Sequence, residues 1–141
     1  MRYVLDASVA LKWVLPEPDS AKAVRLRDDF RVGVYDLLAP DIFPMEVAHA
    51  LAKAERRRVI TPPDGAAKLA DVLRAVPDLH PSLPLLGRAF DIASAARIAV
   101  YDCLYVALAE REGCELVTAD AKLLKNLQAQ FPFLVPLDSM P

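Results

Sequence analysis

Four acidic side chains occupy places in this sequence where carboxylates could do chemistry together. Asp6 and Asp120 each follow a short β-prone run, whereas Glu46 and Asp102 lie near the start of helical patterns. Each has an ordinary explanation when taken alone, because a carboxylate can cap a helix, lie exposed on it, or stabilise its N-terminus by roughly 0.3–1 kcal/mol. Joint chemistry requires that the elements carrying these acids bring them to one place.

The stretch at residues 101–120 predicts a helix, a glycine stop, a buried strand and an acid beyond it. An apolar run and three charged residues precede Gly113, which is a usual residue at the end of a helix. Residues 115–118 fit a short strand. Asp102 is therefore predicted in the first turn of a helix, and Asp120 just past the carboxyl end of a strand.

Elsewhere strand-like and helix-like patterns alternate. Asp41 is expected to cap one helix, and Thr61-Pro62-Pro63-Asp64 has the form of a capping box for the next. Strands are predicted at residues 2–5, 34–39, 78–81 and 133–137, and helices at 9–15, 20–30, 42–58, 66–76, 83 or 85 to 98, and 122–130. This alternation is typical of an α/β fold with a mostly parallel sheet covered on both faces.

The predicted topology would gather the four acids. Ligands bind open parallel sheets outside the carboxyl ends of the strands. Asp6 and Asp120 directly follow strands, and the helices that carry Glu46 and Asp102 are expected to start at the same edge. We therefore expect one acidic site at this edge of the sheet.

Such a site calls for a divalent cation. Carboxylates crowded together repel one another, and their pKa values rise until some are protonated. Mg²⁺ and Mn²⁺ remove that cost, because they take carboxylate and water oxygens and bridge to substrate phosphate. The expected chemistry is phosphoryl transfer to a metal-activated water, and the residues leave open whether one ion or two act.

Four segments, each carrying one of the acids, resemble the PIN-domain ribonucleases and most closely the VapC toxins of prokaryotic toxin–antitoxin pairs. The segments are Val4–Trp13, Ala39–Val47, Tyr101–Ala109 and Val117–Asp120. Their order and spacing match the family over nearly the whole chain.

The resemblance implies a three-layer α/β/α sandwich whose acidic pocket holds Mg²⁺ or Mn²⁺. It implies an endoribonuclease that hydrolyses RNA phosphodiester bonds, leaving 5′-phosphate and 3′-hydroxyl ends. The acids carried over by position, as catalytic residues and metal ligands, are Asp6, Glu46, Asp102 and Asp120, with Asp6 and Asp102 the first candidates for direct metal contact.

Further expectations come from the same resemblance. Ser8 and Thr118 match hydroxyl positions that the family places beside the acids, and we count them as candidate substrate-binding residues. His49 departs from the asparagine that similar chains usually carry one turn after the glutamate. Family members commonly form homodimers, and a VapB antitoxin holds them inactive with a tail that enters the active-site groove.

Basic residues could contact RNA phosphates. Lys12, Lys122 and Lys125 flank the helices that follow Asp6 and Asp120, so we take them as candidates for RNA binding. The run Arg56-Arg57-Arg58 also suits the dipole at a helix C-terminus, and we favour that structural interpretation.

Other chemically capable residues have structural explanations. Trp13 and Tyr105 could stack on RNA bases. They lie on apolar helix patterns, however, and core packing is the favoured interpretation. His49 and His80 are also interpreted as structural, because a metal-activated water needs neither.

Composition limits the class of protein. The chain has 141 residues, which suits a single domain over 1–141, and 55% of them are hydrophobic. No apolar run approaches the ~18 residues needed to cross a bilayer, and no signal peptide is evident at the start, so we expect a cytoplasmic protein. The high apolar content suggests that a partner or a second copy of the chain covers part of the surface. Cys103 and Cys114 lack metal-ligand spacing and are interpreted as reduced core thiols. The net charge of -2 neither indicates nor excludes a nucleic-acid partner.

Several rival functions remain open. The first is a catalytically silent PIN-like module that only binds a protein partner. The second is another metal-dependent phosphohydrolase, such as a DNA nuclease. A haloacid-dehalogenase-like phosphatase needs a second aspartate two residues after the first, where this chain has Ser8. A receiver-like phosphorylation domain needs adjacent acids after its first strand, which Asp6-Ala7 does not supply.

Overall fold

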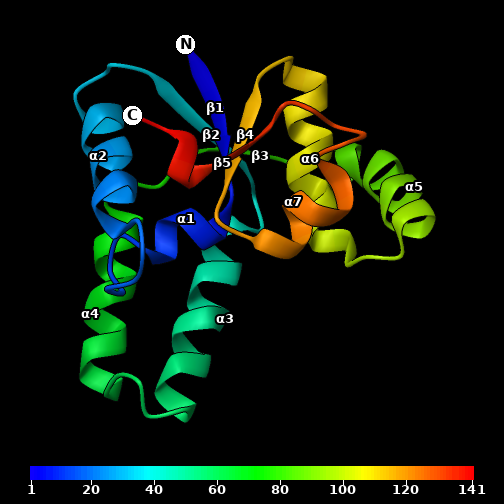
Figure 1. Cartoon of the computed structure of the whole chain (residues 1–141). Coiled ribbons are helices and arrows are strands. Elements are labelled where there is room, and N and C mark those ends of the chain that lie inside the picture. The colour runs from blue at the N-terminus through cyan, green and yellow to red at the C-terminus, as the bar shows by residue number, and fades with distance from the viewer.

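Five short parallel strands form the centre of the molecule (Figure 1). The structure is a computed structural model that describes residues 1–141. The strands are Arg2–Leu5 (β1), Asp36–Pro40 (β2), Asp78–His80 (β3), Glu115–Thr118 (β4) and Leu134–Pro136 (β5), in the order β3-β2-β1-β4-β5. β1 and β4 are neighbours, with Leu5 opposite Val117, so their carboxyl ends emerge side by side.

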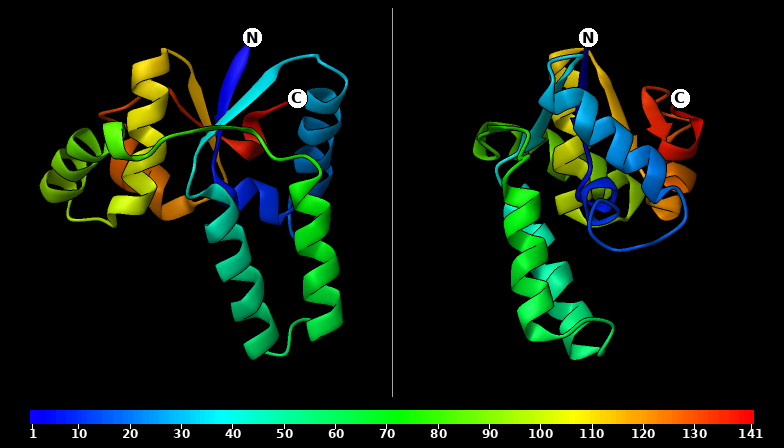
Figure 2. Two further views of the ribbon diagram at one scale, coloured as in Figure 1. Left: turned by 180° about the vertical axis from the view of Figure 1, so that it is seen from behind. Right: turned by 90° about the vertical axis from the view of Figure 1, so that its left-hand side faces the viewer.

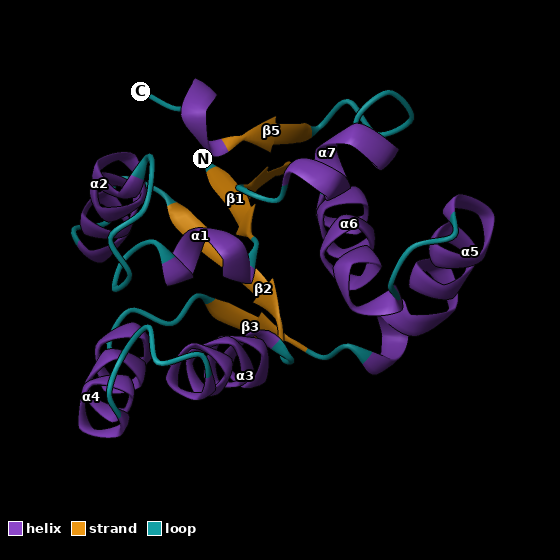
Figure 3. Ribbon diagram, turned by 60° about the horizontal axis from the view of Figure 1, so that its bottom comes forward, coloured by secondary structure: helices purple, strands orange, loops and turns teal.

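Helices cover both faces of the sheet, which confirms the predicted α/β/α layers (Figure 3). The α-helices are Ala7–Leu11 (α1), Ser20–Arg31 (α2), Phe43–Arg56 (α3), Pro62–Leu73 (α4), Leu86–Ala96 (α5), Val100–Glu112 (α6) and Ala121–Leu127 (α7). Short 3₁₀ turns lie at Leu83–Leu85 (η1) and Leu137–Ser139 (η2). α6 packs on β1, β2 and β4 with α5 outside it. α3 and α4 form a hairpin that extends away from the sheet (Figure 2).

α6 is the central helix of its layer because its middle two turns are apolar on every side. Its residues Cys103–Ala109 are all buried between the sheet and α5. Gly113 then ends the helix in the left-handed region, at φ 65°, where glycine has no side chain to clash. The predicted first-turn position of Asp102 is confirmed, so a buried helix fixes this acid against the sheet.

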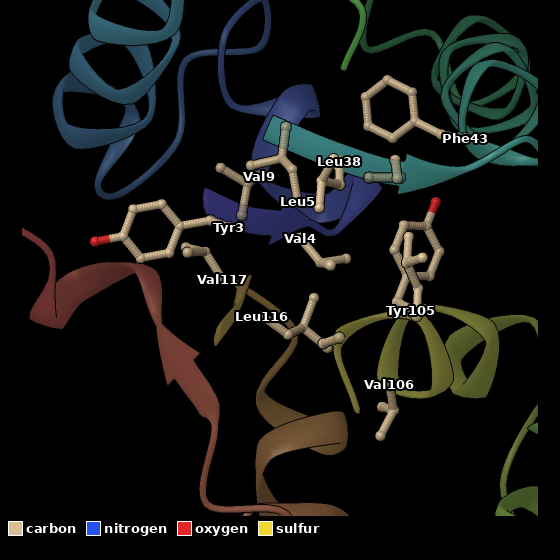
Figure 4. Close-up of a cluster of buried hydrophobic side chains, with 14 of the residues drawn as sticks. Tyr3, Val4, Leu5, Val9, Leu38, Phe43, Tyr105, Val106, Leu116 and Val117 are labelled. Carbon is tan, nitrogen blue, oxygen red and sulfur yellow. The ribbon is translucent and has the colours of Figure 1, made fainter. Parts of the chain in front are cut away.

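One hydrophobic core supports the carboxyl edge of the sheet (Figure 4). Val4, Leu5, Leu116 and Val117 supply fully buried side chains from the two central strands. Tyr105 rises from α6 toward the side of the core where Phe43 of α3 lies. The acids at this edge therefore stand on a packed and rigid base.

Two local predictions about helix starts are wrong. Asp41 does not cap α3; its carboxylate accepts hydrogen bonds from the backbone N–H and hydroxyl of Ser82. Thr61 is the N-cap residue of α4 and Pro62 the first helical residue, as the capping box predicts, but the Thr61 side chain makes no capping hydrogen bond and the predicted helix start at Ala66 is four residues late. Proline at the first helical position already has the required φ and lacks an N–H to satisfy.

No helix in the structure combines the length and apolar character that crossing a bilayer would require.

Candidate active site

All four acids line one cavity of about 890 Å³ at the carboxyl edge of the sheet. Asp6 follows β1 and Asp120 follows β4, while Glu46 and Asp102 lie in the first turns of α3 and α6. Chain segments more than a hundred residues apart thus supply one wall. We call this space the acidic cavity; its remaining lining includes Ser8, Leu11, Ile42, Met45, His49, Lys53 and Tyr101.

Asp6 is the most deeply placed of the four, with 6% of its surface exposed. It occupies the N-cap position of α1, but its side chain does not cap the helix. Its Oδ2 instead accepts hydrogen bonds of 2.7 Å from the hydroxyls of Ser8 and Thr118. Burial raises the pKa of Asp6, and the two hydroxyl donors oppose that rise by favouring the charged form.

The two hydroxyls are themselves oriented by the backbone that follows β4. The Ala119 N–H donates to Ser8 Oγ and the Asp120 N–H donates to Thr118 Oγ1, each at 3.0 Å. Each hydroxyl oxygen therefore accepts from the backbone while its proton points to Asp6. This chain of hydrogen bonds ties the ends of β1 and β4 together through the acid.

Asp120 caps α7 as well as lining the cavity. Its Oδ1 accepts hydrogen bonds from the backbone N–H groups of Lys122 and Leu123, at 2.9 and 3.2 Å. Asp120 is therefore both the N-cap of α7 and a residue of the acidic cavity. Oδ2 makes no hydrogen bond to the protein and remains available to a ligand.

Glu46 is held by a residue whose role the sequence did not reveal. The Tyr105 hydroxyl donates a 2.6 Å hydrogen bond to Glu46 Oε1. Burial raises the pKa of Glu46, the Tyr105 donor opposes the rise, and the charge of Asp6 adds to it. Tyr105 is fully buried, as predicted, yet its hydroxyl reaches the site. Its position three residues after Asp102, on the same face of α6, was the available signal.

The carboxylate of Asp102 makes no hydrogen bond to the protein, and its pKa is raised to about 7. Burial is the largest cause, followed by the negative charges of Asp6, Asp120 and Glu46. The carboxylates are therefore close enough to repel one another, as the sequence predicts for a shared site.

The donor set fits a hydrated divalent cation. Each of the four acids keeps at least one carboxylate oxygen to which no side chain donates. No group of three or more His, Cys, Asp or Glu side chains is placed so that it could hold a metal ion by side chains alone. Mg²⁺ is usually held by one or two carboxylates and several waters, so an open arrangement of hard oxygens suits it.

A second cavity of about 500 Å³ adjoins the first, and the two share Asp102 and Asp120. Its other wall is positively charged, because Arg97, Lys122 and Lys125 line it. We call it the basic cavity. Lys122 and Lys125 were expected near the acids, whereas Arg97 was missed because it lies in the turn between two helices.

The remaining predicted contacts lie apart from the two cavities. Lys12 donates to the backbone oxygen of Pro18 at 2.9 Å and lies 3.7 Å from Glu17. Arg56, Arg57 and Arg58 line neither the acidic nor the basic cavity. Trp13 is buried in the core, as predicted.

The sequence matches the PIN domain family over residues 3–128. Ribonuclease VapC9 of Mycobacterium tuberculosis is 32% identical over 132 residues, which cover 94% of this chain and 96% of that protein.

Two solved structures share the fold. PAE2754 from Pyrobaculum aerophilum has a TM-score of 0.71 and 22% identity, over 99% of this chain and 85% of that one. VapBC2 from Rickettsia felis, bound to a DNA fragment from its promoter, has a TM-score of 0.66 and 15% identity, over 96% and 97%. Because the family match spans most of the sequence and the VapC relative covers nearly all of it, the chain belongs to the PIN-domain family and, within it, to the VapC proteins.

Proposed function

We propose that this protein is a Mg²⁺- or Mn²⁺-dependent endoribonuclease and the toxin of a type II toxin–antitoxin pair. The observation that carries the proposal is the acidic cavity, where four carboxylates converge in a chain related to VapC ribonucleases. Three of these acids, Asp6, Glu46 and Asp102, have raised pKa values, which is typical of a site built for a cation.

Asp6 and Asp102 are the proposed direct metal ligands, with Glu46 and Asp120 completing the site. A bound divalent cation supplies Lewis-acid activation of water and neutralises charge on the phosphate. Ser8 and Thr118 hold Asp6 by one oxygen, so that Oδ1 faces away from the hydroxyl donors. Tyr105 holds Glu46 in the same way, leaving Oε2 to orient or accept a proton from the attacking water.

The surroundings of the acids suit single-stranded RNA. Met45 and Tyr101 are exposed at the acidic cavity, at 63% and 59%, and offer apolar surface on which a base can stack. Lys122 offers a cation at the adjoining cavity. Direct contact of Ser8, Thr118 or Lys12 with the substrate stays a prediction. Each of these side chains already makes a hydrogen bond within the protein and would have to share or exchange it to bind RNA.

The test is cleavage of total cellular RNA by the purified protein with Mg²⁺, Mn²⁺ or EDTA. Discrete products should appear only with metal and should vanish in Asp6→Asn and Asp102→Asn. Asp91→Asn, which removes an exposed carboxylate on α5, is the matched control and should cleave normally. Products that persist in EDTA, or in both active-site variants, would contradict the proposal.

Two rivals give different outcomes in the same experiment. A silent binding module would cleave nothing, and calorimetric titration would detect no bound Mg²⁺ or Mn²⁺. A DNA nuclease would cut single-stranded or duplex DNA in place of RNA under the same metal conditions. Either result would replace the ribonuclease proposal.

The proposed protein partner is a VapB-like antitoxin. The fold similarity to VapBC2, which was solved as a complex, supports a partner of this kind. Co-expression with the product of a neighbouring short gene should yield a stable complex without nuclease activity. Free, active protein after such co-expression would count against the pairing.

A homodimer is also proposed. Leu83, Leu86 and Phe90 are 80%, 43% and 62% exposed, and their spacing of three and four residues places them on one side of η1 and α5. Such a stripe is typical of a surface that a second copy covers. Sedimentation at micromolar concentration should give the mass of two chains.

A single domain over 1–141 and a cytoplasmic location stay predictions.

A further inference from the structure

Three cations line the basic cavity without a carboxylate partner. Arg97, Lys122 and Lys125 belong to none of the seven ion pairs in the structure. None of the three side chains lies within ion-pair distance of a carboxylate, although Asp102 and Asp120 line the same cavity. All three residues are exposed, and a group of accessible cations without ion-pair partners attracts an anionic ligand.

The backbone at Arg97 is held in an unusual conformation. Arg97 ends α5 in the left-handed region, with φ 59° and ψ 47°, which a residue with a side chain rarely adopts. The Ile98 N–H donates to the Ala93 carbonyl at 3.2 Å and closes the end of this helix. The chain thus turns at Arg97, which is one of the residues that line the basic cavity. Strained positions of this kind are concentrated at functional sites.

The other two cations come from a different element. Lys122 and Lys125 lie three residues apart on α7, so they project from the same side of that helix. Asn126 adds an amide to the same lining. Arg97 and the two lysines thus bring a guanidinium and two ammonium groups from two parts of the chain to the lining of one cavity, which suits the tetrahedral oxyanion of a phosphodiester.

The basic cavity meets the acidic cavity at Asp102 and Asp120, which line both. An RNA strand that approaches these carboxylates is repelled by them wherever its own charge is not neutralised. A strand that crosses this boundary places one phosphate at the acids and a neighbouring phosphate among the three cations.

We propose that Arg97, Lys122 and Lys125 bind the phosphate next to the scissile one, so that the cut strand runs from the basic cavity across Asp102 and Asp120 into the acidic cavity. This inference rests on the proposed ribonuclease function. It assigns to the three cations the positioning of the strand, and to Arg97 a role beyond ending a helix.

The first test measures RNA affinity apart from cleavage. Full-length protein carrying Asp6→Asn is titrated into a fluorescein-labelled, mixed-sequence single-stranded RNA 12-mer over a series of KCl concentrations. Arg97→Gln should weaken binding several-fold and reduce the slope of log affinity against log salt by about 0.7, the value expected for one phosphate contact on a single strand. Lys122→Gln and Lys125→Gln should act in the same direction.

Control variants separate charge from folding. Arg97→Lys should retain the salt slope, because it keeps the charge while leaving the strained backbone occupied by a side chain. Arg25→Gln removes an unpaired arginine on α2, at a cavity shared with Tyr3 and Tyr35, and should leave RNA affinity unchanged. Equal slopes for Arg97→Gln and the parent protein would overturn the inference.

The second test locates the contact on the strand. Once the cut site is mapped in active protein, a neutral methylphosphonate replaces the phosphodiester one linkage away, on either side in turn. At one of these two positions Arg97→Gln should cause no further loss of cleavage rate, because the contact is already absent. If Arg97→Gln and the methylphosphonate each reduce the cleavage rate by their own full factor at both positions, the inference is wrong.

The outcomes also distinguish this inference from the proposed function. A protein that cleaves and binds RNA with an unaltered salt slope in all three variants keeps its ribonuclease function but loses the proposed phosphate site. A wild-type protein that neither binds nor cleaves RNA loses both. If Arg97→Gln weakens capture of an acidic peptide but not of RNA, the basic cavity belongs to a protein partner, and the inference is wrong.

Discussion

Asp6 illustrates how a buried carboxylate is stabilised without a cationic side chain beside it. Burying a charge is costly unless hydrogen bonds compensate it. Ser8 and Thr118 supply those bonds, and both donate to the same oxygen, Oδ2. The arrangement leaves Oδ1 without a hydroxyl donor. One oxygen of Asp6 therefore fixes the side chain and the other remains available to a metal ion.

Tyr105→Phe tests whether the position of Glu46 matters to catalysis. The change removes the 2.6 Å hydrogen bond to Glu46 Oε1 but keeps a fully buried aromatic ring in the core. Groups that orient a metal-site carboxylate typically contribute roughly 10- to 100-fold to metal affinity or activity. We expect RNA cleavage to fall by about 10-fold, with the larger change in the apparent affinity for Mn²⁺.

The matched control is Tyr35→Phe, which removes a 3.3 Å hydrogen bond to Asp29 away from both cavities. It should leave cleavage and metal dependence unchanged. If Tyr105→Phe cleaves like the parent protein at every Mn²⁺ concentration, Glu46 does not depend on this hydrogen bond for its function.

The acids of the site, and the hydroxyls of Ser8 and Thr118 beside them, could be predicted from the sequence and its family resemblance, but the support of Glu46 by Tyr105 could not. Asp6 and Asp120 follow strands whose bounds, 2–5 and 115–118, came directly from β-prone runs next to turn residues. The contact between Tyr105 and Glu46 joins positions 59 residues apart, and local periodicity carries no information about such a pairing. Arg97 was missed for a related reason, because its backbone conformation is imposed by how α5 meets α6.

At the scale of elements, helix limits were the least accurate predictions. α1 ends at Leu11, although the apolar pattern continues to Leu15, because the short segment after it turns toward α2. The strand predicted at 34–39 is Asp36–Pro40, since Val34 is 59% exposed and pairs with no neighbour. Tertiary packing decides where these elements end, and the hydrophobic pattern of the sequence does not contain that information.

Gly113 and Gly87 form a matched pair for testing the helix ends on which the site depends. Gly113 ends α6 at φ 65°, with no atom within 4 Å of an added Cβ, so Gly113→Ala introduces backbone strain without a steric clash. We expect the free energy of unfolding to fall by about 1 kcal/mol. Gly87 lies inside α5 with equally open space, and Gly87→Ala should raise the free energy of unfolding by up to about 1 kcal/mol.

Urea unfolding of the two variants beside the parent protein measures both changes. Equal destabilisation by the two substitutions would mean that the left-handed conformation of Gly113 is not what the protein requires at this position. Since α6 carries Asp102 at its other end, the catalytic rate of Gly113→Ala should stay close to that of the parent as long as the protein is folded.

At the scale of the whole molecule, the acidic cavity opposes folding. Asp6, Glu46 and Asp102 all have pKa values raised by burial, so the folded chain holds protons that the unfolded chain releases. The sheet, the core and α6 must therefore stabilise a site whose charges repel one another. This is the usual relation between a functional site and the rest of a fold.

The stability of the metal-free protein should consequently fall as pH rises. An unfolded aspartate loses its proton near pH 4, whereas Asp102 in the folded protein keeps its proton until about pH 7. Between these values the folded state binds more protons than the unfolded state, so the free energy of unfolding decreases with pH, by up to about 1.4 kcal/mol per pH unit for each such group. Urea unfolding in EDTA across this range measures the slope.

The same linkage separates the proposed metal site from a merely acidic pocket. Asp102→Asn should flatten the dependence on pH, because the amide neither titrates nor adds to the repulsion, whereas the exposed control Asp91→Asn should leave the slope unchanged. Mg²⁺ or Mn²⁺ should restore stability above pH 7 in the parent protein, since a ligand that binds only the folded state stabilises it by mass action. A free energy of unfolding that stays flat or rises with pH in EDTA would refute the predicted repulsion. A decrease with pH that neither Mg²⁺ nor Mn²⁺ reverses would refute the cation site but not the burial of the acids.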